Sequence, residues 1–142
     1  MANAIEEILR WTTPFMSMSR TATRDHELRG QQIKEGETVV MMYPPANRDP
    51  RYFDDPHTFD VRREFKKGQL AFGFGRHFCL GAPLARLEVR VVLEEVLKRM
   101  PDFDLDGEAV FQRTSFIRGL LELPLKFTPG EKIGTKAPWG IV

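Results

Sequence analysis

The chain has 142 residues, of which 42% are hydrophobic and 29% charged, the composition of an ordinary globular domain with a modest core. Its formal net charge of +1 gives no general reason to expect a nucleic-acid partner, and no apolar run approaches the length of a transmembrane helix. The single cysteine excludes an intramolecular disulfide framework, and the first 20 residues lack the layout of a signal peptide.

The N-terminal segment, residues 2–11, is predicted to form a helix that presents Ile5, Ile8 and Leu9 on one face. Glu7 and Arg10 are three residues apart, so their side chains can pair along one side of this helix. By itself such a spacing is a weak motif, typical of a solvated surface pair worth about 0.2–0.5 kcal/mol.

Short strands and turns are expected to follow the helix. Residues 16–22 alternate apolar with polar side chains, residues 29–31 predict a turn, and residues 38–43 form a plausible strand. The proline-rich residues 44–50 predict a single helical turn between loops. Residues 51–70 have no periodicity, and an irregular segment of that length is typical of a functional region.

The most informative stretch is Phe-Gly-Phe-Gly-Arg-His-Phe-Cys-Leu-Gly at residues 72–81, which contains the only cysteine, Cys79. Gly75 and Gly81 are expected to give the backbone the freedom that tight turns need. Pro83 suits the first turn of a helix, whose free amide groups and positive dipole end favour a thiolate at Cys79, the form that binds metal. The aromatic side chains of the stretch are expected to keep water from the sulfur.

A long helix is predicted from this loop to about Arg99, where Pro101 ends it. Two apolar stripes along it predict packing on both sides. Residues 102–128 indicate strands and turns, and residues 129–142 a loose tail.

The pattern Phe72-x-x-Gly75-x-His77-x-Cys79-x-Gly81, with Ala85 following, resembles the haem-ligand signature of the cytochrome P450 family, in particular its bacterial soluble branch. A lone cysteine is more often a small buried hydrophobic residue, but ten patterned residues opening a helix favour the haem interpretation. The resemblance implies an α+β, mainly α fold, with residues 1–128 forming the C-terminal part of a haem domain and residues 129–142 a flexible tail.

The resemblance also implies site residues. Cys79 would be the axial ligand of the iron of haem b. Arg20 and His77 would meet haem propionates, and four further residues would contact the cofactor, namely Phe72, Gly73, Gly81 and Ala85. Without the resemblance, an arginine such as Arg20 is most often simply solvated.

Four residues are expected to have structural roles: Glu7, Arg10, Asn47 and Arg48. In the family the Glu7–Arg10 pair takes a third partner, arginine or histidine, from a later loop. The aligned position here is Thr58, and Arg48, Arg62 or Arg63 are the candidates to replace it.

The resemblance further implies an apolar substrate pocket and a redox-partner face. The pocket residues would be Phe15, Met16, Met18, Phe116 and Ile117, for which core packing is an equally good interpretation. A basic face would receive an acidic, ferredoxin-type electron donor, although a merely solvated face is at least as good a reading. Its residues would be Arg62, Arg63, Lys66, Lys67, Arg76 and Arg86.

Two functional hypotheses follow. The first is a cytoplasmic haem-thiolate monooxygenase that hydroxylates an apolar organic substrate with dioxygen and two electrons, although this chain lacks the family's distal, oxygen-activating helix. The alternative is a truncated or degenerate, non-catalytic fragment with at most weak haem binding. A zinc site, a dinucleotide fingerprint and a cysteine nucleophile are disfavoured, because ligand spacing, the third glycine and an oriented base are missing.

Overall fold

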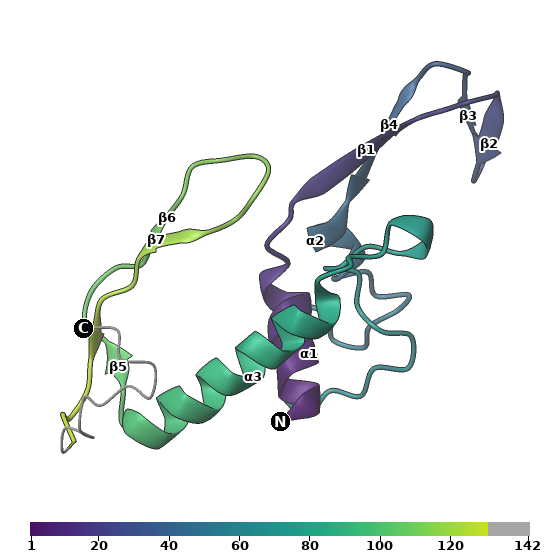
Figure 1. Ribbon diagram of the computed structural model, residues 1–142. Helices are drawn as coiled ribbons and strands as arrows, with labels where there is room; N and C mark the ends of the chain where they lie inside the picture. Colours follow the sequence, from purple (N-terminus) through teal and green to yellow (C-terminus); the bar gives the residue numbers. More distant parts are fainter. Residues whose placement is uncertain (131–142) are drawn as a thin grey trace.

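Two helices cross at the centre of the computed structural model, which describes residues 1–130 (Figure 1). Helix α1, Ala2–Thr12, packs against helix α3, Ala82–Arg99, and buries Ile5 and Leu9. Helix α1 ends where Thr13 adopts a left-handed conformation and donates its amide hydrogen to the carbonyl oxygen of Leu9, 3.0 Å away. Both helices lie within about one residue of the bounds predicted from the sequence.

Four strands follow α1 as two hairpin-like pairs. Strand β1, Ser17–Thr21, pairs antiparallel with β4, Thr38–Met42. Between them, β2, His26–Leu28, pairs with β3, Gln31–Ile33. The turn joining β2 to β3 is formed at Arg29 and Gly30, which both have positive φ angles, as the predicted turn requires. This ladder projects away from the crossing helices (Figure 1).

The segment between β4 and α3 contains little regular structure. A short helix, α2 at Tyr43–Ala46, is followed by turns through residues 47–74, and a single 3₁₀ turn, η1 at Gly75–His77, precedes α3. The irregular region expected at residues 51–70 is therefore present. Its turns lie against α1, where Asp60 and Gln69 donate hydrogen bonds to Glu7 and Glu6 (Figure 1).

Beyond α3 the chain forms two further two-stranded sheets. Strand β5, Asp104–Leu105, pairs with β8, Leu125–Lys126, and β6, Val110–Phe111, pairs with β7, Leu120–Glu122. The loop between β6 and β7 returns to the segment after α1, where Ile117 forms a β-bridge with Phe15. Apart from its first two residues, the predicted tail of residues 129–142 lies outside the described part of the chain.

The interior of this part of the chain is small and unusually polar. Its buried apolar residues are Ile5, Leu9, Phe53, Ala71 and Ala82, whereas the largest fully buried side chains are Arg10, Glu7, Asn47 and Thr13. Only Ala82 of α3 is buried, and several apolar residues of this helix are exposed. The prediction was that α3 packs on both sides. Residues 1–130 alone do not cover both sides of this helix. None of the helices in that range is long and apolar enough to cross a membrane.

Candidate functional site: a cysteine loop on a buried ion network

Residues 72–81 fold into a loop closed by its own backbone. The amide of Cys79 donates to the carbonyl oxygen of Phe72 at 3.0 Å, and the amide of Phe78 donates to that of Gly75 at 3.0 Å. Gly73 and Gly75 have φ angles of +74° and +77°, a region that side-chain-bearing residues rarely occupy. The two glycines therefore let the chain turn back, and Cys79 is presented three residues before α3.

Two details of this loop differ from the sequence-based expectation. Gly81 has an ordinary φ of −79°, so the turn does not require a glycine there, and an added Cβ would meet the sulfur of Cys79 at 3.8 Å, an ordinary van der Waals contact. The aromatic shield around the sulfur is also absent, because Cys79 is exposed and Phe74 is 87% exposed. Only Phe72 is partly buried, with its ring edge-to-face against that of Phe78 at 6.3 Å. The thiol is consequently open to a ligand.

A hollow of about 420 Å³ lies beside the loop and brings Arg20 and His77 together. Its remaining wall is mostly apolar and is formed by Met41, Met42, Tyr43, Ala46, Leu70, Gly73 and Phe74. Arg20 is exposed, and within residues 1–130 its side chain donates a single hydrogen bond, to the carbonyl oxygen of Ser19. A cation and an imidazole at the edge of an apolar hollow, with an exposed thiol on the same loop, suit a flat apolar cofactor that carries carboxylates. The residues present therefore fit haem.

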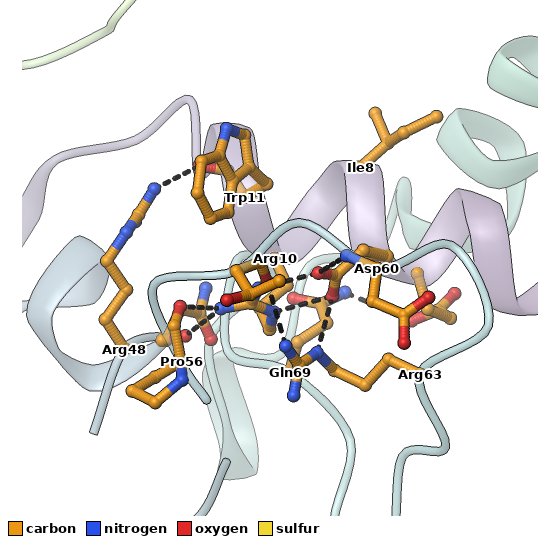
Figure 2. A network of polar contacts seen from close by, with 12 residues as sticks. Ile8, Arg10, Trp11, Arg48, Pro56, Asp60, Arg63 and Gln69 are labelled. Atoms are coloured by element: carbon orange, nitrogen blue, oxygen red, sulfur yellow. Dashed lines mark hydrogen bonds and ion pairs between the residues drawn. The ribbon is translucent and has the colours of Figure 1, made fainter. Parts of the chain in front are cut away.

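The Glu7–Arg10 pair is fully buried rather than solvated. Figure 2 shows Arg10 at the centre of its network, with Pro56, Asp60 and Arg63 around it. Arg10 donates through Nε and Nη2 to the two carboxylate oxygens of Glu7, at 2.7 Å each. Its remaining donors bind the backbone carbonyl oxygens of Asn47 and Pro56 at 2.9 Å and of Thr58 at 3.2 Å. All its polar hydrogens thus have partners, which is the condition under which a buried ion pair is tolerated.

The third partner of the pair is Arg63, one of the three candidates drawn from the sequence. Its Nε donates to Glu7 at 3.1 Å, and its side chain is only 10% exposed. Thr58 contributes its backbone carbonyl oxygen, which accepts hydrogen bonds from both Arg10 and Arg63. Arg62 lies outside the network, 90% exposed and paired with Asp60.

Electrostatics keep Glu7 ionised. Burial opposes its ionisation, but the hydrogen bonds from Arg10 and from the backbone amide of Asp60, with the charges of Arg10 and Arg63, outweigh burial and lower the pKa of Glu7. Arg48 has a lowered pKa, first because of burial and then because of the nearby charges of Arg10 and Arg118. It donates to the carbonyl oxygen of Trp11 at 2.8 Å and lies over the Trp11 ring at 4.9 Å, which ties residue 48 to the end of α1.

Asn47 connects the network to the cysteine loop. Its side-chain nitrogen donates to the hydroxyl of Thr13 at 2.9 Å, and its side-chain oxygen accepts the amide hydrogen of Leu70 at 2.7 Å. Leu70 lies two residues before Phe72. The buried network therefore holds the segment that enters the cysteine loop in a fixed position against α1.

Four of the five predicted pocket residues meet. The rings of Phe15 and Phe116 pack edge-to-face at 5.4 Å, and the amide of Met16 donates to the carbonyl oxygen of Phe116 at 2.9 Å. Ile117 bridges Phe15, whereas Met18 lies further along, in β1 opposite Met41. The loop between β6 and β7 is thus held against the segment that leads from α1 into β1.

The predicted basic face loses two members to internal contacts. Arg63 belongs to the buried network, and Arg86 binds the carboxylate of Glu6. The remaining four members are exposed: Arg62, Lys66, Lys67 and Arg76. Sequence reasoning missed the roles of Glu6, Gln69 and Thr13, because no spacing or residue type marks them.

Comparison with known proteins agrees with this geometry. The family model described as "Cytochrome P450" matches residues 1–119. The chain is 42% identical over 124 residues to "Cytochrome P450-terp" of Pseudomonas sp, covering 87% of this chain and 29% of that protein. It is 44% identical over 137 residues to "Cytochrome P450 monooxygenase PikC" of Streptomyces venezuelae, covering 94% and 33%. The "Steroid C26-monooxygenase" of Mycobacterium tuberculosis (strain ATCC 25618 / H37Rv) is 42% identical over 137 residues, covering 94% and 34%.

Solved structures give the same result. P450BioI in complex with an acyl carrier protein ligated to hexadec-9Z-enoic acid superimposes with a TM-score of 0.84 at 38% identity, over 89% of this chain and 33% of that one. CYP109E1 from Bacillus megaterium in complex with testosterone gives 0.84 at 39% identity, over 89% and 36%. The chain thus spans about a third of the length of these relatives. With a matching family model, close relatives and a shared fold, the chain belongs to the cytochrome P450 family.

Proposed function

We propose that this chain carries the haem-binding C-terminal part of a haem-thiolate monooxygenase, with Cys79 as the axial ligand. The observation that carries the proposal is the exposed thiol of Cys79 on a loop that also lines, through Gly73 and His77, the hollow containing Arg20. Bound haem would supply the activation of dioxygen, and a thiolate ligand favours cleavage of the O–O bond.

The residues of this chain would bind and orient the cofactor. Arg20 and His77 would pair with its propionates, and the positive φ of Gly73 lets the backbone approach closely. Phe72, Gly81 and Ala85 would pack beside the ligand. The cofactor would be haem b, since within these 142 residues the single cysteine, Cys79, is assigned to the iron and none is left for covalent attachment of a c-type haem.

The substrate would be an apolar organic molecule. Two relatives are named for steroid oxidation or were solved with testosterone, and the visible residues at Phe15, Met16, Met18, Phe116 and Ile117 are apolar. In the overall reaction one oxygen atom of dioxygen enters a C–H bond. The other oxygen atom leaves as water with two protons and two donor electrons.

A ferredoxin-type donor in the cytoplasm would supply these electrons. The four exposed basic residues of the predicted face, Arg62, Lys66, Lys67 and Arg76, would steer its acidic surface. Reversing Arg62 and Lys66 to glutamate should slow electron delivery at low ionic strength and have little effect at high ionic strength. Equal rates for wild type and variant at low ionic strength would contradict the proposed donor face.

We do not expect these 142 residues alone to oxidise a substrate. The exposed apolar faces of α3, including Leu84, Leu87 and Val91, indicate that the described part does not by itself enclose a substrate. We therefore expect weak haem binding without substrate oxidation. Oxidation of a steroid by the purified chain with electron donors would show that this expectation is wrong.

Haem titration tests the proposal. Added haem should produce a saturable Soret band, and Arg20→Ala or His77→Ala should weaken binding by about tenfold each, since each removes one propionate partner. Arg24→Ala is the matched control, because Arg24 is exposed and does not line the hollow. Equal affinities for all four proteins would contradict the proposed site.

A further inference from the structure

A second ion pair connects the two sides of the cysteine loop. Arg86, seven residues after Cys79, donates through Nε and Nη2 to the two carboxylate oxygens of Glu6 on α1, the latter at 3.0 Å. Gln69, three residues before Phe72, donates its side-chain amide to the same carboxylate at 3.2 Å. One carboxylate therefore holds both the chain that enters the loop and the helix that leaves it.

The same arginine contacts the base of the loop directly. The guanidinium carbon of Arg86 lies 4.8 Å from the centre of the Phe72 ring, a cation–π arrangement. The carbonyl oxygen of Phe72 accepts the amide hydrogen of Cys79, and its ring packs against Phe78. Phe72 therefore contacts Arg86 through its ring and the amide of Cys79 through its carbonyl oxygen.

The Arg86 and Glu6 side chains are 36% and 24% exposed, and their charges favour the pair. Burial opposes ionisation of Glu6, but the hydrogen bonds from Arg86 and Gln69 outweigh it and lower the pKa of Glu6. The hydrogen bonds that Arg86 donates to the Glu6 carboxylate, first among the causes, raise the pKa of Arg86. Gln69 is itself buried, and its side-chain oxygen accepts the amide hydrogen of Ala71, so it cannot turn away without losing two partners.

We propose that Glu6, Gln69 and Arg86 form a clamp that positions the Cys79 backbone, and that Arg86 is a positioning residue of the thiolate loop rather than a contact for a redox partner. The clamp is separate from the Glu7–Arg10–Arg63 network, since the two share no hydrogen bond in residues 1–130. Its effect on haem ligation rests on the proposed function, whereas its effect on loop order does not.

Amide hydrogen exchange of Cys79, measured by NMR on the chain without haem, tests the clamp. In Arg86→Ala the Cys79 amide should exchange about tenfold faster, because the Phe72 carbonyl that accepts it is no longer held. The amide of Tyr43, bonded to Met16 at the β1–β4 sheet, is the internal reference and should not change. Arg90→Ala, which removes the exposed Arg90–Glu94 pair on the same helix, should leave both rates within about twofold.

The outcomes separate local positioning from general destabilisation. An unchanged Cys79 rate, or equal acceleration of Cys79 and Tyr43, would overturn the proposal. Glu6→Gln, which keeps the side-chain shape but removes the charge, is judged by the same criteria if Arg86→Ala does not fold.

A second experiment measures, in the reduced and CO-bound haem complex, the fraction of haem that has a thiolate ligand. This fraction should fall in Arg86→Ala and stay at the wild-type level in Arg90→Ala. If wild type shows no such complex, the proposed function fails for this chain, and the exchange experiment still decides the clamp.

Discussion

Arg63 and Arg62 are adjacent arginines with opposite environments, and their replacement by alanine should have very different effects. Arg63 is 10% exposed and donates to Glu7 at 3.1 Å and to backbone carbonyl oxygens, including that of Thr58 at 2.9 Å. Arg62 is 90% exposed, and its nearest acidic partner, Asp60, is 3.5 Å away. The pair is a matched test of the buried network.

The magnitude follows from what Arg63→Ala leaves behind. Removing one member of a buried ion pair typically costs about 3–5 kcal/mol, because the other charge stays buried. Glu7 keeps the two hydrogen bonds from Arg10 and one from the amide of Asp60, so we expect a loss of about 2–4 kcal/mol in the free energy of unfolding. Arg62→Ala should cost less than about 0.5 kcal/mol, as for other exposed pairs.

Urea unfolding followed by tryptophan fluorescence measures the difference. Trp11 is adjacent to Arg10 in the sequence, and its ring lies 5.7 Å from the Arg10 guanidinium, so it reports on the network. A Trp139→Phe background makes it the only tryptophan. For a slope of about 2 kcal/mol per molar urea, Arg63→Ala should lower the midpoint by about 1–2 M. Equal midpoints for the two variants would refute the assignment of Arg63 as the third partner.

Three further predictions concern the carboxylates, the loop and the hairpin. In the folded chain the pKa of Glu7 is lowered from its ordinary value of 4.5. The ionised carboxylate should therefore contribute fully to stability above pH 4.5, and this contribution should be lost as the pH falls through the lowered pKa. The urea midpoint of Glu7→Gln should accordingly depend less on pH below 4.5 than that of wild type. Gly73→Ala should cost about 1–2 kcal/mol by urea unfolding because of its positive φ, whereas Gly130→Ala, with nothing within 4 Å of its added Cβ, should be neutral. Phe116→Ala removes an aromatic pair worth about 0.5–1.5 kcal/mol, so trypsin should cut after Arg118 faster than in a Phe127→Ala control; equal rates would show that the pair does not hold the hairpin.

The sequence predicted the elements well where local chemistry decides them. Proline and glycine positions bound α1 and α3 to within about a residue, and the turn at Arg29 and Gly30 formed as expected. The residue types of the cysteine loop were enough to predict that Cys79 lies just before the N-terminus of a helix. Such features depend on a few neighbouring residues, so periodicity and turn preferences suffice.

Long-range contacts were less accessible. The spacing of Glu7 and Arg10 allowed a pair but not its burial, which depends on carbonyl oxygens from Asn47, Pro56 and Thr58. In the clamp, Glu6 binds Gln69, which is 63 positions away in the sequence, and Arg86, which is 80 positions away. No local pattern encodes such contacts. The expected shielding of Cys79 failed for a similar reason, since neighbouring aromatic residues cover a sulfur only where the backbone turns them towards it.

The most direct test of the central claim is the carbon monoxide difference spectrum of the reduced, haem-reconstituted chain, recorded beside Cys79→Ala. We expect a strongly red-shifted Soret band in wild type that disappears in the variant, because Cys79 is the only cysteine of the chain. Absence of the band, or a band of equal position and strength in Cys79→Ala, would contradict the assignment of Cys79 as the haem ligand in this chain.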